Sequence, residues 1–279
     1  MPELPEVETI RRGLAPLVIG KTIAAIEASG KSLRQPLPLA EMRAALPGQT
    51  ITGVRRRAKY LLVECDAGGL LLIHLGMTGN LGLFAADAPM AKHCHVRFRF
   101  SNGDELRYSD SRRFGVILFL PAPYAEAERK FFAATGPEPF DAACSAAWLA
   151  EKTGGPRAKT PIKAALLNSA LIAGIGNIYA CESLFRAGIN PQRAAGGLSA
   201  AEWQGLLTAI RETLAVAIAC GGSSISDYVN ANQQPGYFQM NFNVYGRTNQ
   251  ACRRCGTAIE QIRITGRSSF YCPRCQENE

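Results

Sequence analysis

The sequence lacks an apolar run long enough to cross a membrane, and its first twenty residues lack the apolar core of a secretory signal. It also lacks internal repeats and long low-complexity tracts. These absences exclude membrane and repeat proteins, and we expect a soluble cytoplasmic protein with no membrane partner. At 279 residues, 47% of them apolar, the chain can bury cores in two or three domains.

Acidic residues are comparatively scarce. The chain has 23 Asp and Glu against 31 Lys and Arg, which gives a formal net charge of +8. This excess favours a polyanionic partner such as nucleic acid over a neutral metabolite, although many basic proteins bind no polyanion.

Four of the nine cysteines crowd into the last 28 residues. They form two C-x2-C pairs separated by sixteen residues, the spacing at which two knuckles bind one tetrahedral zinc. The four predicted ligands are Cys252, Cys255, Cys272 and Cys275. Two disulfides are the alternative, which an intracellular location disfavours. Because cysteine fills every ligand position, we expect one structural Zn²⁺.

The residues between the two cysteine pairs predict a β-hairpin. QIRI and SSFYC read as strands joined at Thr265-Gly266-Arg267, which places Arg267 near the hairpin tip. An arginine there can reach a phosphate, but a solvated tip residue fits the spacing equally well.

The remaining pattern indicates an α+β, multidomain fold. Leu4, Val7, Ile10 and Leu14 recur at helical spacing, and short alternating runs from residue 51 to 120 predict antiparallel strands, with Asn102-Gly103 as a turn. Pro, Gly and charge mix around residues 121–143, and helices follow. We expect helices capped at Thr160 and Asn177, and a capping box between Ser199 and Glu202.

We divide the chain into four regions. Residues 1–130 form an amino-terminal helix with a β-sandwich, 131–150 an interdomain linker, 151–225 a helical DNA-binding domain, and 226–279 a segment that ends in the zinc finger.

Several loops carry residues suited to DNA. Arg112, Phe114 and Met77 follow strands, and an apolar wedge beside an arginine can enter a base stack, although Phe and Met are more often core residues. Lys59 ends a basic run directly before an apolar strand. For the pair His93-x-His95 we favour a phosphate contact over a metal site, because no third ligand is evident.

Two positions in the helical half suggest an anion site. The turn Gly174-Ile175-Gly176 precedes Asn177, and free backbone N–H groups at a helix start can bind a phosphate. Lys163 lies near another helix start, where the dipole disfavours a cation unless an anion binds nearby. A solvent-facing lysine is the simpler alternative.

The amino terminus is chemically unusual. Loss of Met1 would leave a secondary amine on Pro2 with a pKa of about 8, so an appreciable neutral fraction could attack a sugar carbon. Glu3 and Glu6 stand where a helix dipole stabilises carboxylates, and Glu3 could act as general acid or base. When this segment is taken alone, an ordinary acidic first turn is the favoured explanation.

Several blocks in one order resemble the formamidopyrimidine-DNA glycosylase (Fpg) family over nearly the whole chain. They are PELPEVETIRRGL, RRAKYLL, HLGMTG, SDSRRFG, GPEP, GIGNIYACESLF, PGYF and the terminal cysteine pairs. The resemblance implies a bilobed protein: a β-sandwich with an amino-terminal helix, then a helix-two-turn-helix domain and a zinc-finger hairpin, with DNA in the cleft between the lobes. It also implies a monomeric base-excision-repair enzyme, a bifunctional DNA glycosylase and abasic-site lyase. Such an enzyme removes oxidised purines, such as 8-oxoguanine and formamidopyrimidines, from duplex DNA and cleaves the strand by β,δ-elimination.

The resemblance also implies roles for single residues. Pro2 would be the Schiff-base nucleophile, Glu3 its acid or base, Lys59 an assisting lysine and Arg267 a catalytic residue held by the zinc. Further residues would contact DNA or the lesion: Met77, Arg112 and Phe114 fill the space of the extruded base, His93, Lys163 and Asn177 contact phosphates, and Glu6 lies near the base pocket.

Two rival hypotheses stay open. The related endonuclease VIII branch shares the chemistry but prefers oxidised pyrimidines, and it usually has glycine where this chain has Leu4. A non-catalytic zinc-ribbon DNA-binding protein would explain the charge and the cysteines without a free Pro2 amine. Lesion preference depends on residues 223–238, where the correspondence is weakest.

Overall fold

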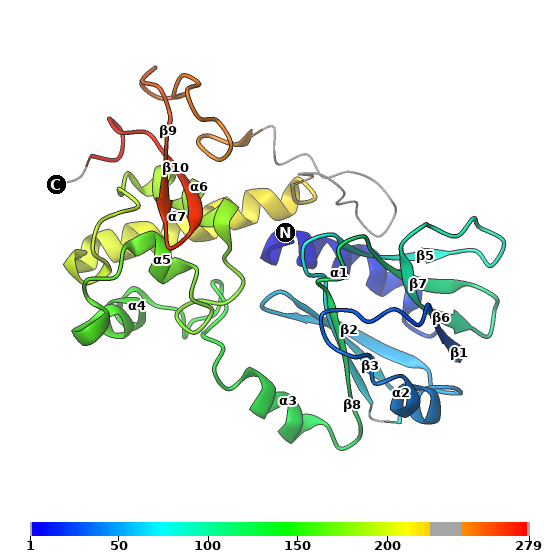
Figure 1. Cartoon of the computed structure of the whole chain (residues 1–279). Helices are drawn as coiled ribbons and strands as arrows, with labels where there is room; N and C mark the ends of the chain where they lie inside the picture. Colours follow the sequence, from blue (N-terminus) through cyan, green and yellow to red (C-terminus); the bar gives the residue numbers. More distant parts are fainter. Residues whose placement is uncertain (1, 68, 224–240, 278–279) are drawn as a thin grey trace. The chain divides into compact units, whose positions relative to one another are not determined.

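The computed structural model describes residues 2–67, 69–223 and 241–277 and divides into two compact units (Figure 1). The first unit comprises Met1–Ala133 and Cys220–Tyr237. The second comprises Ala134–Ala219 and Phe238–Glu279.

The first unit packs one long helix, α1 (Leu4–Val18), against two four-stranded antiparallel sheets. One sheet has the order β1-β6-β7-β5 and the other β2-β3-β4-β8. The strands are β1 (Ile23–Ala28), β2 (Ile51–Arg57), β3 (Tyr60–Cys65), β4 (Leu70–His74), β5 (Gly79–Phe84), β6 (Cys94–Phe100), β7 (Glu105–Asp110) and β8 (Val116–Leu120). Two short helices, α2 (Leu39–Ala45) and α3 (Ala125–Phe132), complete the described part of this unit. The predicted helix and antiparallel β-sandwich are therefore confirmed.

One hydrophobic core joins α1 to both sheets. The apolar face of α1 is fully buried, and it meets Phe98 and Tyr108 from one sheet and Leu61 and Ile73 from the other. Helical spacing on α1 and alternation in the strands place these residues on inward faces. The core therefore fixes where the strands end and where their loops begin.

Two tight turns connect neighbouring antiparallel strands, β2 to β3 and β6 to β7. Arg57 pairs with Tyr60, so Ala58 and Lys59 form a two-residue turn, and Ala58 takes a left-handed φ of 51°. Gly103 takes a φ of 90° in the predicted turn between β6 and β7.

The second unit consists of helices followed by a hairpin. Its helices are α4 (Ala146–Thr153), α5 (Ile162–Leu166), α6 (Asn177–Ala187) and α7 (Ala200–Ala219), with 3₁₀ turns η1 (Gly155–Arg157) and η2 (Ala195–Gly197). The two longer helices, α6 and α7, pack against each other, and β9 (Glu260–Ile264) pairs with β10 (Arg267–Tyr271), the latter beside α6 (Figure 1). The capping box at the start of α7 is confirmed, since Ser199 N donates to Glu202 Oε2 at 2.7 Å and Glu202 N donates to Ser199 Oγ at 3.2 Å.

Two predicted helix starts are wrong. The cap of α5 is Pro161 rather than Thr160, whose carbonyl accepts a hydrogen bond from Ala195 N at 2.8 Å. The cap of α6 is Gly176, and Asn177 is the first helical residue. In both cases contacts with distant segments, which local spacing does not reveal, compete for the polar groups.

Helices α3 and α4 overlap the region around the predicted linker, and the four domain boundaries stay predictions. No helix in the described part of the chain is both long and apolar enough to cross a membrane.

Candidate functional site

The amino terminus is tied to a segment more than 200 residues away in the chain. Pro2 is buried, and Glu3 caps α1 through a capping box in which Glu3 N donates to Glu6 Oε2 at 2.8 Å. The other Glu6 oxygen, Oε1, accepts from Ser223 N at 2.9 Å and from Ser223 Oγ at 3.0 Å. Glu6 is only 1% exposed. Its carboxylate therefore fixes both Glu3, the residue beside Pro2, and Ser223.

Gly222 allows this approach. It takes a left-handed φ of 78°, and a Cβ there would lie 3.2 Å from Glu6 Cγ. A side chain at this position would be strained and would press on the Glu6 carboxylate. Of the segment on which we expect lesion preference to depend, residues 223–238, all but Ser223 lies outside the described residues.

Lys59 stands in the β2–β3 turn near His74. We did not predict a role for His74 from the sequence. The His74 ring packs on Tyr60 with centroids 4.9 Å apart, and His74 Nδ1 accepts from Gly76 N at 3.0 Å. Burial, and then the positive charges of Lys59 and Arg34, lower the pKa of His74 to about 4. The ring is therefore neutral at pH 7, and its proton belongs on Nε2 because Nδ1 is an acceptor.

Sequence reasoning missed His74 because a histidine at a strand end has no distinctive spacing. The available signal was its place directly before Leu-Gly-Met in a block already identified.

The three predicted wedge residues lie on two loops that touch. Met77 and Phe114 are 39% and 42% exposed, and the Arg112 guanidinium lies 4.6 Å from the centre of the Phe114 ring. A Cβ on Gly76 would lie 2.4 Å from the Phe114 carbonyl carbon and 2.5 Å from Gly115 N. The loops therefore meet backbone to backbone, and both large apolar side chains remain exposed.

The two predicted histidines have different surroundings. His95 is buried, its Nε2 lies 2.9 Å from the Asp110 carbonyl oxygen and its Nδ1 lies 3.1 Å from Ser29 Oγ. His93 is exposed at the start of β6. His95 is thus committed to structural hydrogen bonds, whereas the phosphate contact of His93 stays a prediction.

Lys163 and Asn177 lie together within the second unit. Lys163 is 0% exposed, and its ammonium group donates to Asn177 Oδ1 and, at 3.2 Å, to the Ser268 carbonyl. Asn177 Nδ2 donates to the same carbonyl at 2.9 Å. Lys163 is therefore not the solvent-facing lysine of the simpler hypothesis. Both side chains thus bind β10 at Ser268, directly after the exposed Arg267. Their own phosphate contacts stay predictions.

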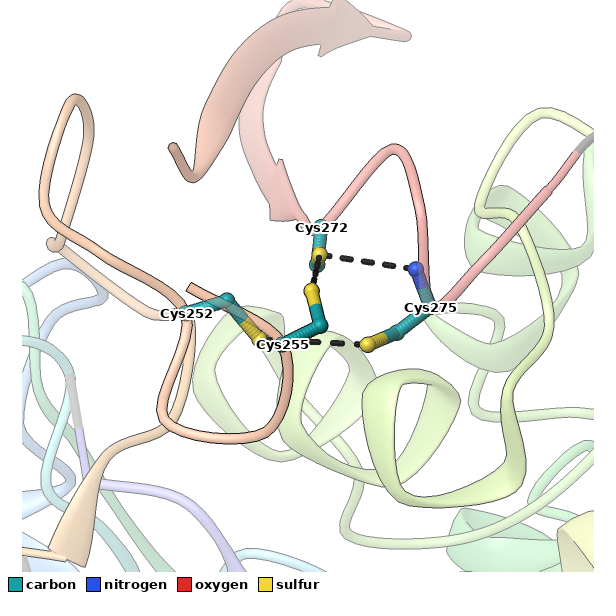
Figure 2. A group of neighbouring side chains, drawn as sticks. All are labelled: Cys252, Cys255, Cys272 and Cys275. Atoms are coloured by element: carbon teal, nitrogen blue, oxygen red, sulfur yellow. Dashed lines mark hydrogen bonds between the residues drawn. The ribbon is translucent and has the colours of Figure 1, made fainter. Parts of the chain in front are cut away.

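The four cysteine side chains converge from two loops, as Figure 2 shows. Their Sγ atoms all lie within 4.8 Å of one another. The Cys252–Cys275 and Cys255–Cys272 sulfurs are 3.9 and 3.5 Å apart, far longer than a disulfide bond of about 2.05 Å. A tetrahedral zinc with Zn–S bonds of about 2.3 Å needs sulfurs about 3.8 Å apart, so the cluster fits one structural Zn²⁺. The disulfide alternative is wrong.

Hydrogen bonds favour the thiolate form of three of these sulfurs, although burial raises the pKa of Cys272 and of Cys275. Cys275 N donates to Cys272 Sγ, and Arg254 N donates to Cys252 Sγ, both at 3.4 Å. Hydrogen bonds from Thr257 lower the pKa of Cys255 to about 6. Such contacts stabilise the negative charge that a zinc ligand carries.

Both cysteine loops are docked on α6 and the turn that follows it. The Arg254 guanidinium lies 4.4 Å from the Phe185 ring centre and donates to the Phe185 carbonyl at 3.2 Å. Gln276 is 0% exposed, and its Nε2 donates to the Ile189 carbonyl at 2.8 Å while its Oε1 accepts from Cys272 N at 3.0 Å. The zinc site is thus part of the packed second unit.

Known protein families match three successive parts of the chain. Residues 1–117 match the formamidopyrimidine-DNA glycosylase N-terminal domain, 135–229 the formamidopyrimidine-DNA glycosylase H2TH domain, and 249–278 a zinc finger found in FPG and IleRS.

Similar proteins cover the full length. A formamidopyrimidine-DNA glycosylase of Dechloromonas aromatica is 49% identical over 99% of this chain and 100% of its own length. One from Ruegeria pomeroyi is 45% identical with the same coverage.

The fold also matches solved structures of Lactococcus lactis Fpg at 36% identity, covering 99% of this chain and 100% of theirs. One is a complex of a variant with DNA containing Fapy-dG, with a TM-score of 0.91, and another is a complex with abasic-site DNA, with a TM-score of 0.90. A third contains DNA with an oxidised pyrimidine, with a TM-score of 0.89.

Proposed function

The chain belongs to the formamidopyrimidine-DNA glycosylase family, and from this premise we propose that it is a bifunctional DNA glycosylase and abasic-site lyase. It excises oxidised purines from duplex DNA as a monomer, with Pro2 as nucleophile, and it then cleaves the strand by β,δ-elimination.

The observation that carries this proposal is the anchoring of the amino terminus. Glu6 accepts hydrogen bonds from both Glu3 N and Ser223 N, so Pro2 precedes a helix start that is fixed to Ser223. An ordinary acidic first turn would not need a carboxylate shared with residue 223.

The chemistry follows from a secondary amine at this place. After removal of Met1, the Pro2 nitrogen donates its lone pair to the sugar C1′, and the bond from C1′ to the base breaks. The base leaves with that electron pair and takes up a proton, while the Pro2 nitrogen loses its own proton. Glu3 can protonate the ring oxygen, which opens the sugar and leaves an iminium ion. The iminium accepts electrons when a C2′ proton leaves, and the 3′ phosphate is eliminated. Loss of a C4′ proton into the conjugated iminium then eliminates the 5′ phosphate.

Other residues of the chain assist this sequence. Lys59 and Arg267 supply positive charge for the phosphate leaving groups, while Met77, Arg112 and Phe114 occupy the space that the extruded nucleotide leaves. The bound zinc supplies no step, because cysteine fills its four ligand positions. It holds the hairpin that carries Arg267.

We propose oxidised purines as the preferred lesions on the strength of the family match. The related structure with an oxidised pyrimidine makes that lesion class a necessary comparison. Excision rates from otherwise identical duplexes with each lesion decide between this preference and the endonuclease VIII branch.

Borohydride trapping tests the proposal directly. We expect the untagged chain to form a covalent adduct with duplex DNA containing 8-oxoguanine, and mass spectrometry of the digested adduct should locate the sugar on Pro2. Pro2→Gly should lose most of the adduct, because a primary amine replaces the constrained secondary amine. Pro5→Ala, which changes a neighbouring proline inside α1, should retain it.

Two results would contradict the proposal. No adduct would favour a zinc-ribbon DNA-binding protein without chemistry. An adduct on another residue, unaffected by Pro2→Gly, would refute the assignment of the nucleophile.

A further inference from the structure

Asp110 is a buried carboxylate at the end of β7, directly before the loop that carries Arg112 and Phe114. It is 0% exposed. We propose that Asp110 is a positioning residue that joins the Met77 loop to the Arg112–Phe114 loop, so that the three exposed side chains enter the DNA as one preassembled unit. This inference rests on the proposed function.

The Asp110 carboxylate binds both loops at once. Its Oδ1 accepts from Thr78 Oγ1 at 2.5 Å and from Arg112 N at 3.2 Å. Its Oδ2 accepts from Gly115 N at 2.8 Å. Arg112 N also donates to Thr78 Oγ1 at 3.1 Å, which closes a small ring of hydrogen bonds between the loops. Two members of this ring, Thr78 and Gly115, directly follow the inserting residues Met77 and Phe114, and a third, Arg112, is an inserting residue itself.

Tyr108, on the same strand, also binds the Asp110 carboxylate. Its hydroxyl donates to Asp110 Oδ2 at 3.2 Å, and its side chain is fully buried. A Cβ on Gly115 would lie 1.6 Å from this hydroxyl, and one on Gly79 would lie 2.6 Å from it. The two glycines therefore let both loops pack against the Tyr108 hydroxyl, whose hydrogen bond the Asp110 carboxylate accepts.

The ring needs a group that only accepts. An ionised aspartate offers about four lone-pair sites to its four donors, whereas an asparagine must turn an NH₂ group toward at least one of them. In D110N the NH₂ group therefore faces the N–H of Arg112 or that of Gly115, because each carboxylate oxygen accepts from one of them. A buried donor without an acceptor is costly, so the two loops should separate while the sheet beneath them remains.

Such separation should affect base extrusion more than bond breaking. An enzyme that acts on a base in a duplex must unpair and unstack it, and side chains that fill the gap offset that cost. Loops already held in place bring these side chains without a further loss of conformational entropy. Asp110 should matter less when the lesion has no partner base, because no base pair then needs to be broken.

Single-turnover excision from two duplexes tests the inference. One carries 8-oxoguanine opposite cytosine, and the other carries it opposite an abasic-site analogue. We expect D110N to slow excision of the paired lesion about tenfold, which corresponds to ~1.4 kcal/mol on the barrier, and to slow excision of the unpaired lesion much less. In an F114A background D110N should add little, because the two residues act in the same step.

Two further variants give the comparison its controls. Y108F removes one donor but keeps both loops on the carboxylate, so its ratio between the two substrates should match that of the wild type. T78V cuts the link between the loops while it keeps Asp110, and it should show the D110N pattern. If thermal unfolding shows that D110N does not fold, T78V decides the question.

Equal slowing of both substrates by T78V and D110N would overturn the role of Asp110 and leave the proposed function standing. An unchanged rate on the paired lesion would do the same. A wild-type chain that excises neither lesion would overturn the proposed function and this inference together.

Discussion

Several buried carboxylates in the described part of the chain accept hydrogen bonds from backbone N–H groups, and three of them bind residues outside their own helix or strand. Asp110 binds the wedge loops and Glu6 binds Ser223. Glu182, which is 2% exposed in α6, accepts from the N–H groups of residues 243, 244 and 245 at 2.9–3.1 Å. A buried carboxylate that meets main-chain donors fixes the backbone itself, whatever side chains the loop carries.

The neutral state of His74 predicts a pH dependence of stability. In the unfolded chain this ring binds a proton below pH 6.5, whereas in the folded chain it does so only below about pH 4. The unfolded state therefore holds more protons between these values, and stability falls as the pH drops from 6.5 to 4. The free energy of unfolding should fall by roughly 3 kcal/mol across this pH window. His74→Gln should remove this pH dependence.

Melting temperatures at intervals between pH 4 and pH 7 measure this effect. His93→Gln is the matched control, because that ring is exposed, and the wild-type slope should persist in it. A slope that persists in His74→Gln would show that other groups cause the acid sensitivity.

Residue chemistry was only partly predictable from the sequence. The spacing of the cysteines was enough to predict the zinc site, because a C-x2-C pair brings its own ligands together. The hydrogen bonds of Lys163 were harder to predict, since its partners Asn177 and Ser268 lie 14 and 105 positions away. The neutral state of His74 likewise depends on burial and on charges from other segments.

At the scale of elements, the zinc-bound loops and the β9–β10 hairpin should act together. Removing one ligand should release the hairpin from α6, because Arg254 and Gln276 dock the loops only while the cysteines are held together. We expect Cys255→Ser to lose zinc and to weaken binding to abasic-site DNA at least about tenfold, or ~1.4 kcal/mol.

Metal content and a DNA-binding titration check this prediction. Cys94→Ser removes a half-buried free thiol of the first unit and should keep both zinc and affinity. A Cys255→Ser chain with full zinc content, or one that binds DNA as tightly without zinc, would show that the hairpin is held by packing alone.

Elements whose signals are local were predicted correctly. Alternating strands, the Asn102-Gly103 turn and the Ser199–Glu202 capping box each depend on residues within a few positions. The starts of α5 and α6 were each misplaced by one residue, because the Thr160 carbonyl and the Asn177 side chain bind distant partners. Ala58, a non-glycine residue with a positive φ, follows from the two-residue hairpin and not from its side chain.

At the scale of the whole molecule, binding and chemistry should be separable. Positive charge is spread over the chain, with a net value of +8, whereas the proposed nucleophile is a single amine. An amino-terminal tag that blocks Pro2 should abolish excision and borohydride trapping but leave DNA affinity largely intact.

The same tag placed at the carboxyl terminus is the control, and it should leave excision unchanged. Affinity is measured with an abasic-site analogue that the enzyme cannot cleave. Excision by the amino-terminally tagged chain at the wild-type rate would rule out the Pro2 amine.

The close approach at Gly76 has a consequence for any attempt to redesign this protein. Its missing side chain lets the Met77 loop lie against the backbone of Phe114 and Gly115, so neither loop has room to change shape alone. A library that randomises one loop should return mostly inactive clones. Variants with a new tolerance for the base opposite the lesion should emerge only when both loops are diversified together, with Gly76, Gly79 and Gly115 held constant.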